Sequence, residues 1–232
     1  MSEFFRFPHT SHLAWLGSGQ PRDDKVLPAH EVEALLTGDI VVEEKVDGAN
    51  IGFSISGAGA LRVQNRGQYL DRAHSHPQFQ PLWSWLPSRE AALVDTLYPD
   101  LILFGEWCFA VHSVVYDRLP DWFLGFDVYD RRVAGFWDTE RRDMLLADLG
   151  LAGVPRLAGG GVTLTELTEF IYSPSRVGRS AMEGVVVRTE YSGLTAARAK
   201  LVRPEFAQAI DEHWSRGPLR RNELVLGATP WR

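Results

Sequence analysis

The sequence contains a single cysteine, Cys108, so no disulfide can form within the chain. Disulfides are typical of oxidising compartments, and their exclusion favours an intracellular protein. The first residues, MSEFFRFPHTSH, lack the basic stretch and apolar core of a signal peptide. No apolar run approaches the roughly 20 residues that a membrane span needs. We therefore expect a chain that works in the cytoplasm and does not contact a membrane.

An excess of positive charge is also absent. The chain has 24 basic and 30 acidic residues and a net charge of −6, whereas nucleic-acid binding usually shows as a basic footprint. The basic residues are unevenly spread, however, and a group of them gathers late in the chain: Arg188, Arg198, Lys200, Arg203, Arg216, Arg220 and Arg221. A local basic surface is therefore compatible with the sequence.

Apolar material is plentiful. Of the 232 residues, 45% are hydrophobic, and they include 8 tryptophans and 12 phenylalanines. This suffices for one sizeable core, so we expect residues 1–232 to form a single domain.

Short apolar runs separated by turn residues predict strands. IVVEEKV and NIGFSIS flank Asp47-Gly48, and LRVQN follows Gly57-Ala58-Gly59, so residues 40–65 are predicted to form an antiparallel meander. LILFGEW and DWFLGFDVYD are predicted to be buried strands. Residues 182–190 and 197–202 are predicted to pair around a turn at Ser192-Gly193.

Helix signals fall between these strands. Pro28 favours a helix start for residues 28–36, Ser88 and Thr139 are candidate N-caps, and Thr163 with Glu166 matches a capping box. A further helix is predicted from Pro204, with Phe206, Ile210 and Trp214 on one face, and Gly159-Gly160-Gly161 is predicted to be a surface loop. The whole predicts an α+β fold of antiparallel sheets flanked by helices.

The stretch EEKVDGAN, residues 43–50, closes an apolar strand with charge. A lysine at a strand end is most often a solvated charge, and we expect Glu43 to be such a solvent-facing residue. Lys45 differs because Asp47 and Gly48 follow it. An amine becomes a nucleophile only without its proton, so burial or nearby cations must lower its pKa. Attack on a nucleotide α-phosphate, with magnesium balancing the charge, needs such a setting.

Lys45-Val46-Asp47-Gly48 resembles the KxDG signature of the covalent nucleotidyltransferases, the superfamily of ligases and capping enzymes. Five further segments resemble motifs of this superfamily in the same order: Asn65-Arg66-Gly67, Phe104-Gly105-Glu106, Phe126-Asp127, Glu183-Gly184-Val185-Val186-Val187-Arg188 and Arg198-Ala199-Lys200. Each alone has an ordinary explanation, such as a core phenylalanine or a strand-end charge. All of them in the right order are improbable by chance.

The resemblance implies a role for each matched residue. Lys45 would attack ATP and carry AMP, Asp47 and Glu183 would hold Mg²⁺ or Mn²⁺ or orient the lysine, and Lys200 would complete the catalytic set. Nucleotide-binding positions are implied for Glu44, Lys45, Asn50, Arg66, Glu106, Phe126, Arg188, Arg198 and Lys200. Among them, Glu106 would hold the ribose hydroxyls and Phe126 would stack on the purine.

The last motif has two alignments. In one, Arg198 and Lys200 are the pair that grips the α-phosphate, with an arginine where the family usually has lysine. In the other, Lys200 is the first member and Val202 stands at the second position. We favour the first alignment because side chains two residues apart share one face of a strand.

Residues 44–50 resemble the nick-sealing RNA ligases of phage type, whose signature has an asparagine where this chain has Asn50. Residues 105–130 are similar to a bacterial and phage group of small RNA ligases, although His112, Tyr116 and Asp117 within them are expected only to pack a loop. The resemblance implies ATP as the nucleotide and RNA with 3′-hydroxyl and 5′-phosphate ends as the substrate.

The ends of the chain are expected to serve the substrate. We expect residues 1–39 to dock RNA through Arg6, His9, His12, Arg22 and Lys25, and residues 204–232 to form a helix and the basic tail RGPLRR. The 29 residues after Arg203 are too few for the OB-fold of DNA ligases and capping enzymes, so we expect none. We expect a monomer that relies on a partner protein to heal RNA ends.

Two other functions are compatible with the sequence. One is another enzyme of the superfamily, either a DNA nick ligase or an adenylyltransferase with a different acceptor. The other is a catalytically inactive module that binds nucleic-acid ends, although intact Lys45, Asp47, Glu106, Glu183 and Lys200 argue against it. The sequence does not distinguish nicked from single-stranded RNA ends.

Overall fold

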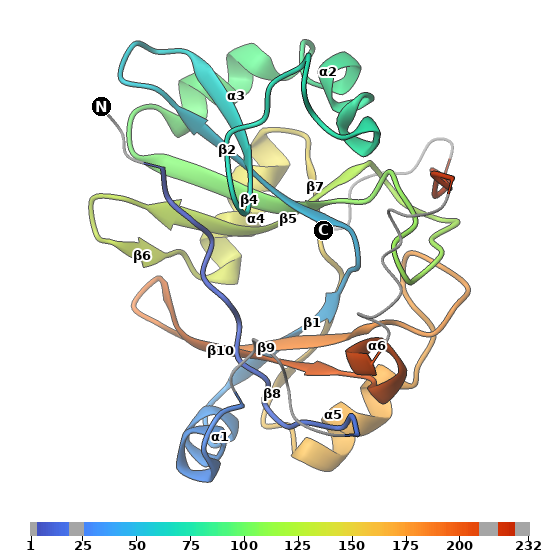
Figure 1. The fold of residues 1–232 in the computed structure, drawn as a ribbon. Helices are drawn as coiled ribbons and strands as arrows, with labels where there is room; N and C mark the ends of the chain where they lie inside the picture. Colours follow the sequence, from blue (N-terminus) through green and yellow to red (C-terminus); the bar gives the residue numbers. More distant parts are fainter. Residues whose placement is uncertain (1–3, 19–25, 209–217, 226–232) are drawn as a thin grey trace.

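The computed structural model describes residues 4–18, 26–208 and 218–225. Figure 1 shows two β-sheets facing each other, with helices on their outer sides. Within the described ranges, the named strands pair in antiparallel fashion except for a short parallel contact between β5 (Phe123–Asp130) and β7 (Ala152–Gly153). The predicted α+β class, with antiparallel sheets flanked by helices, is confirmed.

The smaller sheet has the strand order β10-β9-β1-β8. Its strands are β1 (Ile40–Lys45), β8 (Arg156–Gly160), β9 (Gly184–Tyr191) and β10 (Leu194–Val202). Helices α1 (Ala29–Leu36) and α5 (Leu164–Ile171) cover its outer face (Figure 1). Their Leu35 and Leu167 pack into one buried cluster with Val42 and Val185 of the sheet, which fixes the outer face as apolar.

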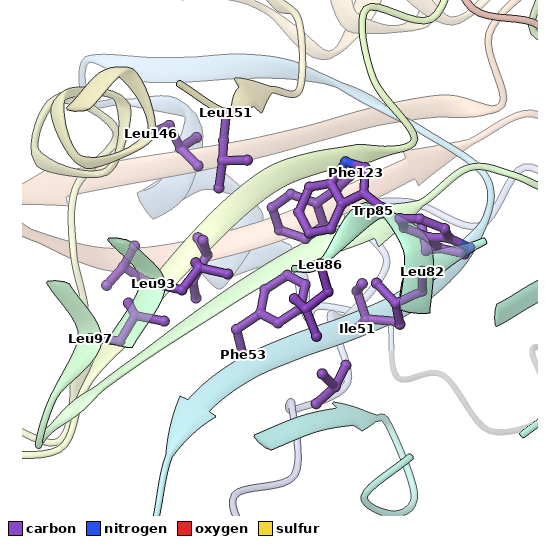
Figure 2. Packing of buried hydrophobic residues seen from close by; sticks show 14 of the residues in the cluster. Ile51, Phe53, Leu82, Trp85, Leu86, Leu93, Leu97, Phe123, Leu146 and Leu151 are labelled. Atoms are coloured by element: carbon purple, nitrogen blue, oxygen red, sulfur yellow. The ribbon is translucent and has the colours of Figure 1, made fainter. Parts of the chain in front are cut away.

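The larger sheet has the order β3-β2-β4-β5-β6, with β7 beside β5. Its remaining strands are β2 (Ala49–Ile55), β3 (Leu61–Asn65), β4 (Leu101–Trp107) and β6 (Gly135–Phe136). The helical segments that accompany it are η1 (Pro77–Phe79), α2 (Leu82–Trp85), α3 (Glu90–Leu97) and α4 (Thr139–Asp148). Figure 2 shows their shared core, in which the ring centroid of Phe53 lies 5.8 Å from that of Trp85 and 5.1 Å from that of Phe123.

The predicted meander over residues 40–65 is wrong in its first strand. β1 pairs with β8 on one side and β9 on the other, so neither edge of β1 is open to β2. The chain instead crosses from the smaller to the larger sheet at 46–48, and β2 then pairs with β3 and β4. Asp47-Gly48 is therefore a crossing between sheets and not a hairpin turn.

Alternation along the strands gives the smaller sheet two unlike faces. Ile40 and Val42 lie in the apolar cluster under the helices, so Glu43 and Lys45 face the larger sheet. By register, Val186 is opposite Glu43, and Lys200 is opposite Val186. The charged residues that break the apolar pattern of β1, β9 and β10 therefore gather between the two sheets.

Several helix boundaries differ from the expectation. Asp138, not Thr139, caps α4 by accepting a hydrogen bond from the Arg141 N–H, and Ser88 does not cap α3, which begins after Arg89 without a side-chain cap. The capping box of Thr163 and Glu166 is confirmed at α5.

Two prolines and a glycine run were also predicted to mark the ends of elements. Pro28 is the cap residue immediately before α1, one position earlier than expected, whereas Pro204 opens α6 (Pro204–Gln208) as expected. Ile210 and Trp214 lie outside the described residues. The predicted loop at 159–161 is wrong, because Gly159 and Gly160 pair with β1. No helix in the described ranges is long and apolar enough to cross a membrane.

Candidate active site

A cavity of about 770 Å³ lies between the two sheets, within the size range of small-molecule sites. Both sheets contribute to its wall: Lys45 from β1, Asn50 from β2, Glu106 from β4 and Arg188 from β9. Charged residues predicted from separate motifs thus converge on one cavity.

Lys45 is the last residue of β1, and its Nζ lies 2.6 Å from Glu183 Oε2. Burial alone would lower the pKa of Lys45, but the carboxylates of Glu183, Glu106 and Asp47 outweigh burial and raise it. Burial raises the pKa of Glu183 against the opposing effect of Lys45. The pair is therefore a half-buried ammonium and carboxylate in direct contact.

Gly184 allows the strand that follows Glu183 to pass this close. Its Cα is opposite Lys45 on one side and Val202 on the other. A Cβ atom at Gly184 would lie 2.2 Å from the Leu201 carbonyl oxygen, which is too close for any residue with a side chain. The glycine of the Glu-Gly motif is required by strand packing and not by a turn.

Asp47 is held by the loop at 108–119. Its Oδ2 accepts hydrogen bonds from the N–H groups of Ser113 at 2.6 Å and Val114 at 3.0 Å. Its own N–H donates to the Tyr116 hydroxyl at 2.8 Å. The crossing that presents Lys45 is therefore anchored on a segment that follows β4.

Glu106 and Asn50 form a cross-strand pair in the larger sheet, since their Cα atoms are partners in the β2–β4 register. Burial raises the pKa of Glu106 to about 8, although Lys45 and Arg66 oppose this shift. The side-chain oxygen of Asn50 is buried and has no hydrogen-bond partner. This orphaned acceptor lies in the wall of the cavity, where a ligand would satisfy it.

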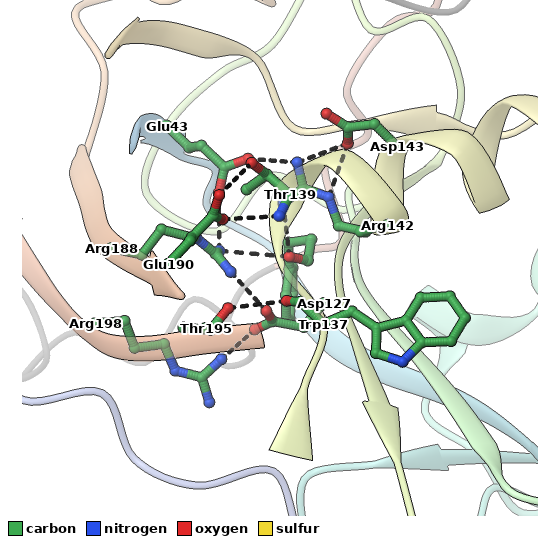
Figure 3. Close-up of polar contacts among 11 residues, drawn as sticks. Glu43, Asp127, Trp137, Thr139, Arg142, Asp143, Arg188, Glu190, Thr195 and Arg198 are labelled. Atoms are coloured by element: carbon green, nitrogen blue, oxygen red, sulfur yellow. Dashed lines mark hydrogen bonds and ion pairs between the residues drawn. The ribbon is translucent and has the colours of Figure 1, made fainter. Parts of the chain in front are cut away.

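Figure 3 shows a buried charge network at another part of the cavity. Arg188 contacts Glu43 at 2.8 Å and Asp127 at 2.7 Å, and Arg198 also pairs with Asp127. Arg142 of α4 contacts Glu43 at 2.6 Å. Because Asp127 and Arg142 belong to the layer of the larger sheet, the network joins both sheets.

The expectation that Glu43 faces solvent is wrong, since its side chain is 1% exposed. Burial by itself would raise the pKa of Glu43, but Arg142 and Arg188 outweigh burial and lower it. Because side chains alternate along β1, Glu43 lies on the same inner face as Lys45. On that face it contacts arginines from two other elements, Arg142 and Arg188.

The other predicted nucleotide-binding residues fall into two groups. Arg66 and Phe126 line the cavity. Glu44 also lines the cavity, but its carboxylate is held by the protein and accepts hydrogen bonds from Ser175 Oγ at 2.5 Å and the Arg176 N–H at 2.8 Å. Lys200 is on the inner face of β10, where its charge lowers the pKa of Glu183, although burial raises that pKa overall.

The two alignments of the last motif give different neighbours. Arg198 lies on the inner face with Lys200, as the favoured alignment requires, but its guanidinium pairs with Asp127 and lies over the rings of Phe7 and Phe136 at 4.6 and 4.2 Å. Val202 is buried opposite Gly184. Lys200 is the member of this motif that lies near the Lys45–Glu183 pair.

Sequence reasoning missed several residues of the site. Phe7, His76 and Gln78 line the cavity, and Gln78 Oε1 lies 2.9 Å from His112 Nε2. His112, which was expected only to pack a loop, also lines the cavity, and burial lowers its pKa. The position of His112 shortly after Glu106 was the one signal available; the others lie far from any motif.

The predicted docking segments are only partly described. Phe5 and Phe7 pack on the larger sheet, while His12 is buried and bridges Lys200 and Val26. Arg22, Lys25 and Arg216 lie outside the described residues. The described residues contain no group of three or more His, Cys, Asp or Glu side chains that could hold a metal ion.

The sequence model of the family "RNA ligase" matches residues 38–202. No curated protein sequence matches the chain significantly.

The fold is similar to solved RNA ligases. For a Naegleria gruberi RNA ligase mutant with ATP and Mn, the TM-score is 0.65 at 16% identity, over 91% of this chain and 60% of that one. For the Naegleria gruberi enzyme with PPi the values are 0.59 and 17%, over 89% and 64%. For an archaeal ATP-dependent RNA ligase they are 0.60 and 19%, over 87% and 49%. The chain thus spans 49 to 64% of the length of these structures, and the likeness shows the fold.

Proposed function

This chain belongs to the RNA ligase family, and from that premise we propose that it joins RNA ends with ATP through a lysyl-AMP intermediate on Lys45. The observation that carries the proposal is the contact of 2.6 Å between Glu183 and the Nζ of Lys45, which lines the cavity. The Naegleria gruberi relatives of similar fold were solved with ATP and Mn, which supports the same nucleotide here.

In the first step, Lys45 Nζ attacks the α-phosphorus of ATP. An N–P bond forms, the bond from that phosphorus to the bridging oxygen breaks, and pyrophosphate leaves. The ammonium must lose a proton before attack, and Glu183 Oε2 at 2.6 Å is placed to receive it. The raised pKa of Glu183, caused by burial, favours this transfer.

In the second step, an oxygen of the RNA 5′-phosphate attacks the α-phosphorus, the N–P bond breaks, and AMP passes to the RNA. In the third, a 3′-hydroxyl attacks the 5′-phosphorus, a phosphodiester forms and AMP leaves. Positioning and charge neutralisation dominate such transfers. Lys200 supplies positive charge on the same strand face as the Lys45–Glu183 pair.

The rest of the nucleotide would occupy the cavity between the sheets. Glu106 and the unpartnered Asn50 oxygen are placed to bind ribose hydroxyls, and Phe126 offers a ring to the purine. Arg66 faces the same space and would contact phosphate or the 3′ end.

The acidic residues fit a divalent cation. Carboxylate oxygens are ligands that Mg²⁺ and Mn²⁺ favour, and such ions are commonly held by one or two carboxylates together with substrate phosphates. Glu183 would be one ligand, and Asp47 would use Oδ1, since its Oδ2 binds the loop at 108–119. When bound, the cation neutralises phosphate charge.

Labelled ATP tests the nucleophile. The chain has only three lysines, Lys25, Lys45 and Lys200, so peptide mapping after denaturation identifies the adduct without ambiguity. We expect a stable AMP label on Lys45 in the presence of Mg²⁺ or Mn²⁺, and none in Lys45→Ala. A label on another lysine would overturn the assigned nucleophile, and an unlabelled wild type would favour the inactive end-binding module.

Nicked duplexes test the substrate. We expect joining when the strand that carries the 3′-hydroxyl is RNA. Joining of all-DNA nicks alone would instead assign the chain to DNA repair within the same superfamily.

A further inference from the structure

We propose that an arginine rim at the Lys45 end of the cleft binds the sugar-phosphate backbone of the RNA strand that carries the 5′-phosphate. The rim consists of five exposed arginines: Arg118, Arg176, Arg179, Arg220 and Arg221. This inference rests on the proposed ligase function and adds to it a binding surface for one of the two RNA ends.

The first part of the rim is a strap, residues 218–225, that lies across the loop at 108–119. Asn222 is 1% exposed, and its side chain accepts from the Tyr116 N–H at 2.8 Å and donates to the Cys108 carbonyl at 2.8 Å. The backbone of Glu223 bonds to Tyr116 and to Leu119. A strap held by a buried side chain and by backbone on both limbs of the loop has a defined position.

This anchoring puts the backbone of Arg220 and Arg221 beside the part of the loop that leads to the cavity wall. The Val111 N–H donates to the Arg220 carbonyl at 2.9 Å, and Arg221 forms a bridge with Ala110. The next residue along the loop is His112, which lines the cavity. The two arginines therefore begin two residues from the cavity wall.

The second part of the rim is the segment 173–181, which precedes Glu183. The Arg176 N–H donates to the Glu44 carboxylate, and Glu44 is the neighbour of Lys45. Asp117 lies 2.8 Å from Arg179 Nε and 3.7 Å from Arg118 Nε, so one acid is shared by two rim arginines, and the Arg179 side chain stays 87% exposed. Arg118 donates to the Gly178 carbonyl at 2.5 Å, which ties this segment to the loop under the strap.

The charges inside the cleft explain why an outer surface is needed. Arg188 and Arg198 both pair with Asp127, and Arg188 also pairs with Glu43, so their charge is already balanced within the protein. The whole chain carries a net charge of −6, which repels RNA. A strand held at Lys45 therefore needs cations just outside the cleft, and guanidinium groups bind phosphates in a bidentate manner.

Two double variants and a matched control test the rim. Arg220→Ser with Arg221→Ser changes the strap, and Arg176→Ser with Arg179→Ser changes the second segment. The control, Arg132→Ser with Arg156→Ser, removes the same charge from the turn after β5, where Arg132 pairs with Asp130, and from the edge strand β8. Lysyl-AMP formation, AMP transfer to a 5′-phosphorylated RNA oligonucleotide, and RNA affinity across salt concentrations are measured for each.

We expect both rim variants to form lysyl-AMP at the wild-type rate and to transfer AMP to RNA at least about tenfold more slowly at subsaturating RNA. Their plots of log affinity against log salt should be shallower by roughly 0.7 per lost phosphate contact. The control should behave as wild type. The proposal would be overturned if the rim variants transferred AMP to RNA at the wild-type rate. It would also be overturned if they lost lysyl-AMP formation as much as AMP transfer. A wild type without lysyl-AMP would overturn the proposed function instead.

Discussion

At the scale of single residues, the site is a lysine surrounded by acids. Glu183 touches Lys45, Asp47 adds negative charge, and Glu106 adds more above its own pKa of about 8, so the pKa of Lys45 is raised despite its burial. A protonated lysine cannot attack phosphorus. Lys45, the proposed nucleophile, is thus held in an inactive protonation state, and we expect its activation to require a change in the charge around these carboxylates when substrates bind.

The raised pKa of Glu106, about 8, makes a prediction for stability. Between the unfolded pKa of about 4.3 and a folded pKa of about 8, the folded chain holds a proton at Glu106 that the unfolded chain has lost. The free energy of unfolding therefore falls as pH rises through this window, by up to about 1.4 kcal/mol per pH unit for this group. In Glu106→Gln, the free energy of unfolding should lack this decrease with pH. Urea denaturation at pH 5, 6.5, 8 and 9 measures both curves.

Above the folded pKa, Glu106 is ionised in both states and its contribution to the slope vanishes. The curves of wild type and Glu106→Gln should therefore diverge between pH 5 and 8 and run parallel beyond. Parallel curves over the whole range would show that Glu106 is ionised in the folded chain at neutral pH.

The residues found from the sequence alone are those in contiguous motifs. Lys45, Glu106 and Glu183 stand beside glycines or aspartates whose spacing is recognisable. Lys45 and Glu106 line the cavity, and Glu183 contacts Lys45. Glu43 escaped because its partners, Arg142 and Arg188, are distant in sequence and carry no local signal. The sequence around a charged strand residue does not show whether residues of opposite charge will lie on the same side of the sheet.

At the scale of secondary structure, the crossing from β1 to β2 determines where Lys45 lies. An Asp-Gly pair between apolar strands is typical of a hairpin, and this local rule predicted the wrong pairing. Long-range partners override it, because β8 and β9 occupy both edges of β1. By contrast, the β9–β10 hairpin around Ser192 and Gly193 was predictable, since its strands are neighbours in both sequence and sheet.

Gly48 gives the element-scale prediction. A Cβ atom there would lie 2.7 Å from the backbone oxygen of Trp107, which cannot move without disturbing β4. Gly48→Ala should therefore displace the crossing, lower lysyl-AMP formation by about 100-fold through misplacement of Lys45, and destabilise the fold by about 1–3 kcal/mol. Single-turnover adenylylation and urea denaturation measure the two effects.

The matched control is Gly57→Ala in the turn between β2 and β3, where a new Cβ meets no atom within 4 Å. It should adenylylate at the wild-type rate. Equal rates for the two glycine variants would mean that the crossing adapts and does not set the position of Lys45.

At the scale of the whole molecule, two sheets with separate apolar cores share a polar interface. The core of the larger sheet contains Phe53 and Phe123, and that of the smaller sheet contains Val42 and Val185. Apolar contacts within each core do not join the sheets to each other. The buried ion pairs of Asp127 cross this interface and help to set the width of the cleft (Figure 3).

Asp127→Asn should therefore destabilise the molecule strongly, since it leaves two buried arginines short of a negative partner. We expect a loss of about 3–5 kcal/mol in urea denaturation, the range for breaking a buried ion pair. Glu205→Gln makes the same chemical change in an exposed pair, 3.7 Å from Arg203, and should cost less than about 1 kcal/mol. A similar cost for both variants would contradict a structural role for the network.

A double-mutant cycle separates the network from a general effect of losing a carboxylate. Arg198→Met removes one of the two arginines that Asp127 neutralises, together with the guanidinium that lies over Phe7, and keeps an apolar side chain in its place. Asp127→Asn should cost less in the Arg198→Met background than in wild type, because fewer unpaired charges remain buried. The residual cost then belongs to Arg188, which pairs with Asp127 on one side and Glu43 on the other. Since Glu43 is two residues from Lys45 on the same strand face, the ion pairs that join the sheets also fix the strand that carries the nucleophile.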